Sequence, residues 1–194
     1  MKRISAILLS VMITVLLVPS LVYALTPTTE QALAERMGKT MPDFTIDTVN
    51  GEPFCLSEEL EEHELVLLNF WATWCPPCAR EFPYMEEAYS QYSDRVSILA
   101  LSIDPNDTDE MIRNYAEKYD LTFAVGSDRK PNIASNFITG SIPTTVVIDR
   151  FGNIALVEVG AKSDAADFTA LFDYFLSEDY TETTVLNTFP KAAS

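Results

Sequence analysis

The sequence predicts an α/β sandwich in which helices flank a central mixed β-sheet, and three observations support this fold class. Short apolar runs rich in β-branched residues alternate with segments whose apolar residues recur at helical spacing. Two of these runs, at residues 144–149 and 154–159, flank the turn sequence Phe151-Gly152-Asn153 and are typical of a β-hairpin. The 194-residue chain is 47% hydrophobic, which is enough for one domain with its own core.

The predicted domain begins with another hairpin. The dipeptide Asn50-Gly51 favours a tight turn between the extended segments 44–47 and 53–56. A short acidic helix is expected to begin at Ser57. Residues 65–71 form an apolar run that predicts a buried strand, and residues 79–92 have the pattern of a helix.

The second half of the chain continues the alternation. Asp107 and Glu110 have capping-box spacing and predict a helix start, and Ser163 is placed to cap the last helix. The remaining elements are expected to be strands at residues 96–103, 123–125, 144–149 and 154–159, and a short helix at residues 133–138.

Residues 1–24 are expected to lie outside the domain. Lys2 and Arg3 precede an apolar stretch over residues 4–18, and Ala24 suits a signal-peptidase site. The same stretch, extended to residue 25, is about long enough to cross a bilayer core of ~30 Å, so cleavage and a retained anchor both stay open. Either outcome places the domain outside the cytoplasm, secreted or tethered to the outer face of the cytoplasmic membrane. Residues 25–40 are expected to be a linker, residues 41–178 the domain and residues 179–194 a loose tail.

The net charge of −16 describes an acidic surface that repels phosphate backbones, which disfavours nucleic-acid binding. Three cysteines are too few for a disulfide-stapled scaffold. A structural zinc site needs four ligands, and only Cys55 and His63 remain to complete one, so no metal is expected. Cys55 is expected to be a small buried apolar residue.

The segment Trp74-Cys75-Pro76-Pro77-Cys78 joins a buried strand to the following helix. A cysteine that precedes a helix meets unpaired backbone N–H groups, which favour its thiolate, and we expect Cys75 to face solvent there. Its thiolate would attack a partner disulfide, and Cys78 would resolve the mixed disulfide. Pro76 and Pro77 fit the first helical turn, where a missing N–H costs little, and are expected to tune the reduction potential.

Glu81 lies three residues after Cys78, so both side chains are expected on one face of the helix. A carboxyl group with a raised pKa at this place could exchange the proton that Cys78 must lose before it attacks. The alternative is a solvated glutamate on the helix surface. Trp74 is expected at the rim where a partner docks, and Trp71 in the core.

Residues 69–83, with the sequence NFWATWCPPCAREFP, resemble the active-site segment of extracytoplasmic thioredoxin-like proteins of the TlpA/ResA type. The resemblance extends to Ser141-Ile142-Pro143-Thr144-Thr145 and to the order of elements between about Met41 and Leu176. It implies a thioredoxin-like fold, with a central mixed β-sheet flanked by helices and an N-terminal β-hairpin extension.

The resemblance also implies roles for individual residues. Pro143 matches the cis-proline of the fold, which would lay the Ile142 backbone beside Cys75, where a substrate strand can pair with it. A glutamate at the place of Glu81 is associated with proton handling in this subgroup. The general thioredoxin pattern instead has a buried Asp where this chain has Asn69.

The implied function is that of an exported thiol–disulfide oxidoreductase that reduces disulfides in extracytoplasmic proteins, for example in cytochrome c maturation, and needs no cofactor. It would act as a monomer and receive electrons from a membrane thiol donor of the CcdA/DsbD kind. The sequence leaves the direction of electron flow open, so an oxidase or isomerase is one alternative. A thiol-dependent peroxidase is another, although the paired cysteines after WATW favour exchange.

Overall fold

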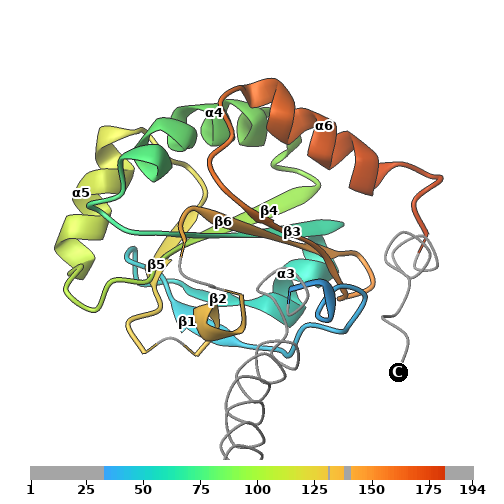
Figure 1. Cartoon of the computed structure of the whole chain (residues 1–194), viewed down its shortest axis with the longest axis horizontal. Helices are drawn as coiled ribbons and strands as arrows, with labels where there is room; N and C mark the ends of the chain where they lie inside the picture. The colour runs from blue at the N-terminus through green and yellow to red at the C-terminus, as the bar shows by residue number, and fades with distance from the viewer. Residues whose placement is uncertain (1–32, 131, 138–140, 182–194) are drawn as a thin grey trace, which may run out of the picture. The chain divides into compact units, whose positions relative to one another are not determined.

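The computed structural model describes residues 33–130, 132–137 and 141–181, and in this part of the chain five strands form one mixed sheet (Figure 1). Their order across the sheet is β5-β4-β3-β6-β7. β3 lies at the centre, parallel to β4 on one side and antiparallel to β6 on the other. The strands are β3 Leu65–Trp71, β4 Val96–Ser102, β5 Ala124–Ser127, β6 Thr144–Asp149 and β7 Ile154–Val159.

The central strand β3 is buried along its whole length, which explains its uninterrupted apolar run. Because successive side chains of a strand point to opposite faces of the sheet, its residues divide between two cores. Leu67 and Trp71 belong to one core cluster, while Leu68 and Phe70 belong to the other. The sheet therefore has packed layers on both faces.

Helices α4 Pro76–Tyr92, α5 Asp109–Lys118 and α6 Ala165–Leu176 cover one face of the sheet (Figure 1). Phe82 of α4 and Phe168 of α6 join Trp71 in the core cluster on this face. The rings of Trp71 and Phe82 meet edge to face, with their centroids 4.9 Å apart. This contact fixes the beginning of α4 against the C-terminal end of β3, and it places Trp71 in the core as predicted.

The other face is covered by the N-terminal hairpin, by α3 Leu56–Glu62 and by a 3₁₀ turn, η1 Ala134–Asn136. The hairpin consists of β1 Thr45–Asp47 and β2 Pro53–Cys55, which pair antiparallel. Gly51 has a φ of 87° at the turn, a conformation that favours glycine. The mixed sheet, its flanking helices and the N-terminal hairpin confirm the predicted fold class.

Two helices start later than predicted. α5 is capped by Thr108, whose Oγ1 accepts a hydrogen bond from the Met111 N–H at 3.2 Å. Asp107 cannot serve as this cap because its carboxylate accepts hydrogen bonds from other elements. α6 is capped by Asp164, whose Oδ1 accepts from the Ala166 N–H at 2.9 Å, rather than by Ser163. In its described part, the helix expected at residues 133–138 is only η1.

The expected loose tail is packed at its start. Tyr180 is buried, and its hydroxyl donates a hydrogen bond to Asp149 Oδ2 at 2.8 Å. Arg150 donates to the carbonyl oxygens of Ser177 and Tyr180 at 2.9 and 3.1 Å. The packed domain therefore continues past its expected end at residue 178, and residues 182–194 lie outside the described part of the chain.

Gly38 of the expected linker and Met41, at the expected start of the domain, are both bound to the β6–β7 turn. The N–H of Gly38 donates to the Ile154 carbonyl, and the N–H of Met41 donates to the Gly152 carbonyl, both at 2.8 Å. Residues 1–32, which include the expected signal peptide or anchor, lie outside the described residues. Among the residues that are described, no helix is both long enough and apolar enough to span a bilayer.

Candidate active site

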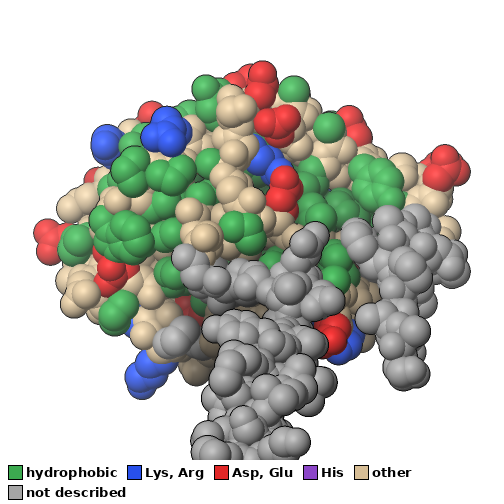
Figure 2. Space-filling view, viewed as in Figure 1, with side chains coloured by type: hydrophobic (Ala, Val, Ile, Leu, Met, Phe, Trp, Pro, Cys, Tyr) green, Lys and Arg blue, Asp and Glu red, His purple; other side chains and the backbone are tan. Residues whose placement is uncertain are grey.

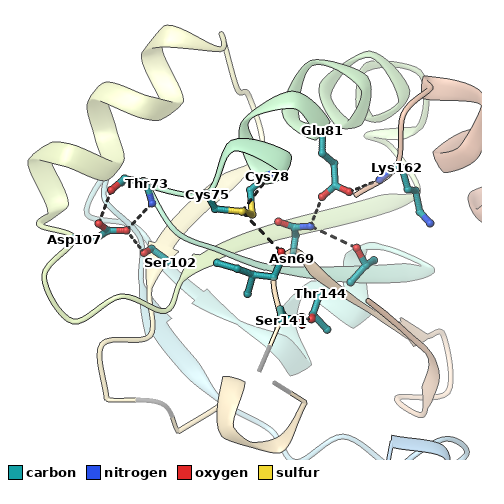
Figure 3. Close-up of a disulfide and its surroundings, with 12 residues drawn as sticks. Asn69, Thr73, Cys75, Cys78, Glu81, Ser102, Asp107, Ser141, Thr144 and Lys162 are labelled. Atoms are coloured by element: carbon teal, nitrogen blue, oxygen red, sulfur yellow. Dashed lines mark hydrogen bonds between the residues drawn. A yellow bond between two sulfur atoms is a disulfide. The ribbon is translucent and has the colours of Figure 1, made fainter. Parts of the chain in front are cut away.

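Cys75 and Cys78 form a disulfide at the start of α4 (Figure 3). The helix begins at Pro76, earlier than the sequence pattern indicates, so Cys75 is its N-cap and Cys78 lies in its first turn. The backbone N–H of Cys78 donates to Cys75 Sγ at 3.2 Å. This donor and the helix N-terminus stabilise negative charge on the Cys75 sulfur once the disulfide is reduced.

The sequence predicted that Cys75 faces solvent, and this prediction is wrong for the disulfide form. Only 2% of the surface of Cys75 is exposed there. It packs in the same core cluster as Trp71, and the carbonyl oxygen of Ile142 lies 3.9 Å from its Sγ. The Ile142–Pro143 peptide bond is cis, as the resemblance implied. The fold thus brings the Ile142 backbone beside Cys75 from a segment 67 residues away in the sequence.

Pro76 and Pro77 occupy the first two positions of α4. Proline carries no N–H, so in this first turn the donor to Cys75 Sγ is the Cys78 N–H. A helix N-terminus without these prolines would present further unpaired N–H groups to the sulfur. The dipeptide therefore limits how strongly α4 stabilises a Cys75 thiolate.

Glu81 is completely buried, which rules out the alternative of a solvated glutamate on the helix surface. Asn69 Nδ2 donates to its Oε1 at 2.8 Å, and the backbone N–H of Lys162 donates to its Oε2 at 2.7 Å (Figure 3). Burial raises the pKa of Glu81 to about 7, although both hydrogen bonds act to lower it. A group with this pKa can take up and release a proton near neutral pH.

The loop between β3 and α4 is held by a carboxylate from the β4–α5 connection. Asp107 accepts hydrogen bonds from the Thr73 N–H at 2.9 Å and from the Thr73 hydroxyl at 2.6 Å (Figure 3). It also accepts from the Ser102 hydroxyl at 2.5 Å. Because Asp107 is only 2% exposed, these bonds are shielded from water and fix the backbone two residues before Cys75.

Trp74 stands at the rim of the site, with 62% of its surface exposed. Its indole N–H donates to a carboxylate oxygen of Asp104, which holds the ring in one orientation. Figure 2 shows hydrophobic side chains gathered on the visible face beside α5 and the start of α4. Met111 of α5 is another large hydrophobic residue with substantial exposure. The rim therefore offers apolar area to a docking partner.

Sequence reasoning did not identify Asp104, Asp107 or Lys162 as residues of this site. A signal for the two aspartates does exist, because they follow β4, which lies beside β3 in the sheet. The carboxyl ends of parallel neighbours meet at one sheet edge, where the loop after β3 also lies. Lys162 acts through its backbone N–H, so its side chain gives no such signal.

Cys55 is not the buried apolar residue that the sequence predicted. It is half-exposed, with its sulfur 3.3 Å from Ser57 Oγ, and this hydrogen bond lowers the pKa of its thiol. The reason is its place at the N-cap of the short helix α3, where its side chain turns towards Ser57. Within the described ranges, no three Asp, Glu, His or Cys side chains are grouped to hold a metal ion.

Comparison with known proteins adds to this geometry. A model of the AhpC/TSA family matches residues 37–157. Thioredoxin-like protein YneN of Bacillus subtilis (strain 168) is 37% identical over 127 residues, which are 65% of this chain and 73% of that protein. Thiol-disulfide oxidoreductase ResA of Geobacillus thermodenitrificans (strain NG80-2) is 34% identical over 167 residues, which are 84% of this chain and 92% of that protein.

The fold has a similar counterpart among solved structures. The crystal structure of a thiol:disulfide interchange protein of the thioredoxin family from Chlorobium tepidum TLS matches with a TM-score of 0.63 at 31% identity. The match covers 72% of this chain and 97% of that one. The chain therefore belongs to the AhpC/TSA family, and it is a thiol–disulfide oxidoreductase of the ResA type whose CxxC pair is Cys75 and Cys78.

Proposed function

We propose that this chain is an exported reductase that transfers two electrons from its Cys75–Cys78 dithiol to disulfides in other extracytoplasmic proteins. Cys75 is the attacking thiol, Cys78 the resolving thiol and Glu81 the group that takes the proton from Cys78. The substrates include disulfides of the kind reduced during cytochrome c maturation, which the resemblance to TlpA/ResA proteins supports.

In the proposed reaction, the Cys75 thiolate attacks one sulfur of the partner disulfide and displaces the other sulfur, which leaves as a thiolate and takes up a proton. Cys78 then gives its proton to Glu81 and attacks Cys75 Sγ. The bond between Cys75 and the partner breaks, and the second partner sulfur leaves with a proton. The partner gains two electrons, the Cys75–Cys78 pair loses two, and the disulfide at the start of α4 forms again.

The observation that carries the reductive direction is the limited set of donors at Cys75. A stabilised thiolate makes a CxxC protein an oxidant, because it favours the reduced form. Here Pro76 and Pro77 have no N–H to donate. The backbone donor that reaches Cys75 Sγ in the first turn of α4 is the Cys78 N–H. Weak stabilisation of the reduced form favours the disulfide, so the dithiol gives up its electrons readily.

The partner is proposed to dock on the rim formed by Trp74, Pro76, Pro77, Ile142 and Pro143. Trp74 supplies exposed apolar area, and its bond to a carboxylate limits the entropy that the ring loses when a partner covers it. The Ile142 backbone lies beside Cys75 and is proposed to pair with an extended strand of the partner.

Residues 1–24 are proposed to export the chain, either as a cleaved signal peptide or as a retained anchor. The basic start, the apolar stretch and Ala24 support this proposal. A reductase outside the cytoplasm needs electrons carried across the membrane, so we propose a membrane thiol donor of the CcdA/DsbD kind as a second partner. Whole cells that express the full chain should react at Cys75 with a membrane-impermeant thiol reagent after reduction, whereas cells expressing residues 25–194 should not.

The direction of electron flow is tested by titrating the Cys75–Cys78 pair against glutathione buffers. We expect a reduction potential at or below about −250 mV, close to the thioredoxin value of about −270 mV. A potential near about −120 mV, typical of a strong oxidant, would contradict the reductive role. The titration should use a Cys55→Ala variant, so that the third thiol does not enter mixed disulfides.

The substrate is tested by trapping. A Cys78→Ser variant cannot resolve the mixed disulfide, so exported proteins that are reduced by Cys75 should remain covalently attached to it. Both this variant and the matched control, Cys75→Ser/Cys78→Ser, carry Cys55→Ala so that the third thiol forms no mixed disulfides, and the control should capture none. Rapid consumption of hydrogen peroxide by the dithiol, without trapped proteins, would instead identify a thiol-dependent peroxidase.

A further inference from the structure

The side-chain amide of Asn69 has one satisfied end and one unsatisfied end. Its Nδ2 donates to Glu81 Oε1 at 2.8 Å and to Thr145 Oγ1 at 3.4 Å. Its Oδ1 has no hydrogen-bond partner among the described residues, although Asn69 is completely buried. Buried polar atoms in folded proteins are almost always paired, so an unpaired acceptor next to an active site calls for a functional explanation.

The unsatisfied oxygen lies on the side of the redox pair. Figure 3 shows the Asn69 amide between the disulfide and Glu81, with its oxygen towards the sulfurs and its nitrogen towards the carboxylate. Cys78 and Glu81 are three residues apart on α4, so their side chains share one face of that helix. The oxygen of the amide therefore lies on the side of Cys78, and its nitrogen lies on the side of Glu81, one helical turn further along α4.

The orientation of the amide follows from its neighbours. The Glu81 oxygens already accept the Asn69 Nδ2–H and the Lys162 N–H, so a second acceptor facing them would be repelled. The nitrogen therefore faces Glu81 and the oxygen faces away from it, which in Figure 3 is the side of the disulfide. The disulfide has no hydrogen to donate to this oxygen. Reduction with two electrons and two protons gives each sulfur a proton, and an S–H group is a donor.

We propose that Asn69 is a positioning residue whose Oδ1 accepts a hydrogen bond from the Cys78 thiol in the reduced protein while its Nδ2 holds Glu81 ready to receive the Cys78 proton. This inference deepens the proposed function, because it rests on Cys78 as the resolving thiol and Glu81 as its base. A hydrogen bond from the neutral thiol keeps Cys78 protonated, whereas the Cys78 N–H bond to Cys75 Sγ favours the Cys75 thiolate. The two thiols thereby receive different protonation states before a partner binds.

Asn69 acts only before the reaction, when it holds the Cys78 thiol and Glu81 in place. When Cys78 attacks the mixed disulfide, its S–H bond breaks, its proton passes to Glu81, the new Cys75–Cys78 bond forms and the bond from Cys75 to the partner breaks. The Asn69 oxygen loses its donor at the same moment. The amide itself neither gains nor loses a proton, so it positions the reacting groups without entering the balance of the reaction.

The hydrogen bond can be measured directly in a protein with Cys78 as its single thiol, the Cys55→Ala/Cys75→Ala variant. The infrared S–H stretching band of Cys78 should lie at lower frequency than in the same protein carrying Asn69→Leu, which removes the acceptor. Thr145→Val is the matched control, because it removes only the weaker partner of Nδ2 and should leave the band unchanged. An S–H band that does not move in Asn69→Leu would overturn the proposal.

A second readout uses the ionisation of Cys78 in the same single-thiol protein. Loss of the hydrogen bond in Asn69→Leu should raise the ionisation constant of the thiol about five- to tenfold, the change that one hydrogen bond makes. An unchanged or lower ionisation constant would count against the proposal. If Asn69→Leu fails to fold, the carbon-13 shift of the Asn69 side-chain carbonyl in the unaltered protein decides, because it should change between oxidised and reduced forms.

These measurements remain separate from the test of the proposed function. A high reduction potential would overturn the reductive direction, yet the S–H band would still show whether Asn69 accepts from Cys78. Conversely, a low potential together with an unshifted S–H band would leave the reductase intact and remove Asn69 from its mechanism.

Discussion

Glu81 accepts hydrogen bonds from Asn69 and from the Lys162 backbone, yet burial raises its pKa to about 7. Two neutral donors lower the free energy of the carboxylate, but they do not replace the water that a charged group loses inside the protein. In the unfolded chain the same group has a pKa near 4.5. Folding therefore binds a proton at Glu81 whenever the pH lies between these two values.

The sign of the resulting pH dependence follows from the raised pKa. At pH values below 4.5, Glu81 is protonated in both states, and its effect on stability is constant. As the pH rises towards 7, only the unfolded state ionises, so the folded protein becomes less stable by roughly 3 kcal/mol for this shift of the pKa from 4.5 to about 7. We expect the free energy of unfolding of the oxidised wild-type protein to fall by this amount relative to that of Glu81→Gln between pH 4.5 and about 7, as measured by urea unfolding.

The comparison with Glu81→Gln removes contributions from the other carboxyl groups, which titrate alike in both proteins. If the difference in unfolding free energy between the two proteins stays constant with pH, Glu81 does not titrate as described. The rate of thiol exchange adds a further check, because it should lose its dependence on pH near 7 in Glu81→Gln.

Asp107 is the second buried carboxylate near the disulfide, and it accepts three hydrogen bonds from Thr73 and Ser102. Asp107→Ala leaves these donors without a partner, so we expect a loss of about 3 kcal/mol in the free energy of unfolding. The exposed Asp109, which forms an ion pair with Arg129, is the matched control. Asp109→Ala should change stability by no more than about 0.5 kcal/mol, and equal losses in both variants would contradict a special role for Asp107.

At the scale of the element, the N-terminus of α4 decides how well a Cys75 thiolate is stabilised. Pro77→Ala restores an N–H at the second helical position, from which a backbone donor can reach an N-cap side chain. We expect this variant to raise the reduction potential of the pair by about 30 mV, the equivalent of one modest charge-assisted hydrogen bond. Titration against glutathione buffers measures the change.

Pro83 provides the control for this prediction, since it lies in the same helix but is exposed and far from the cap. Pro83→Ala should leave the potential unchanged. A similar rise in both variants would mean that helix propensity, not the restored N–H, controls the potential.

Elements were predictable from the sequence wherever local patterns act alone. The apolar run of β3 and the Asn50-Gly51 turn follow from periodicity and turn chemistry, and both are found in the structure. Helix starts were predicted less well. Asp107 has the chemistry of a helix cap, but its carboxylate accepts a hydrogen bond from Thr73, which lies 34 residues away in the sequence. A distant partner of this kind leaves no trace in local spacing.

The same limit explains the outcome for the candidate site. The CxxC pair and Glu81 could be found because their spacing along one helix defines their relation. Burial of Glu81 depends on Asn69 and on the Lys162 backbone, which come from two other segments, so its environment could not be derived from the helix alone. Cys55 was misjudged for a similar reason, since its exposure depends on how β2 meets α3.

At the scale of the whole domain, residues 177–180 are bound to the end of the sheet that lies opposite the disulfide. Tyr180 donates to Asp149, the last residue of β6, which pairs with Leu65 at the beginning of β3. Tyr180→Phe removes this buried hydrogen bond and should cost about 1–2 kcal/mol in the free energy of unfolding without changing the reduction potential. Tyr174→Phe, at a half-exposed position, is the control and should be nearly neutral.

If Tyr180→Phe were as stable as the control, the hydrogen bond between Tyr180 and Asp149 would contribute nothing to the stability of the domain. A lower potential or a slower exchange rate in Tyr180→Phe would also contradict the argument, because the segment would then influence the distant disulfide. Calorimetry together with the glutathione titration separates these outcomes.

Residues 38–41, at the beginning of the domain, are bound at one end of the central sheet. Gly38 and Met41 bind Ile154 and Gly152 at the turn between β6 and β7, at the end of the sheet opposite the disulfide. The seven residues of β3 separate these two ends by about 20 Å. Residues 38–41 are therefore held a full strand length away from the disulfide, so this end of the sheet can be bound or strained without direct contact with the redox pair.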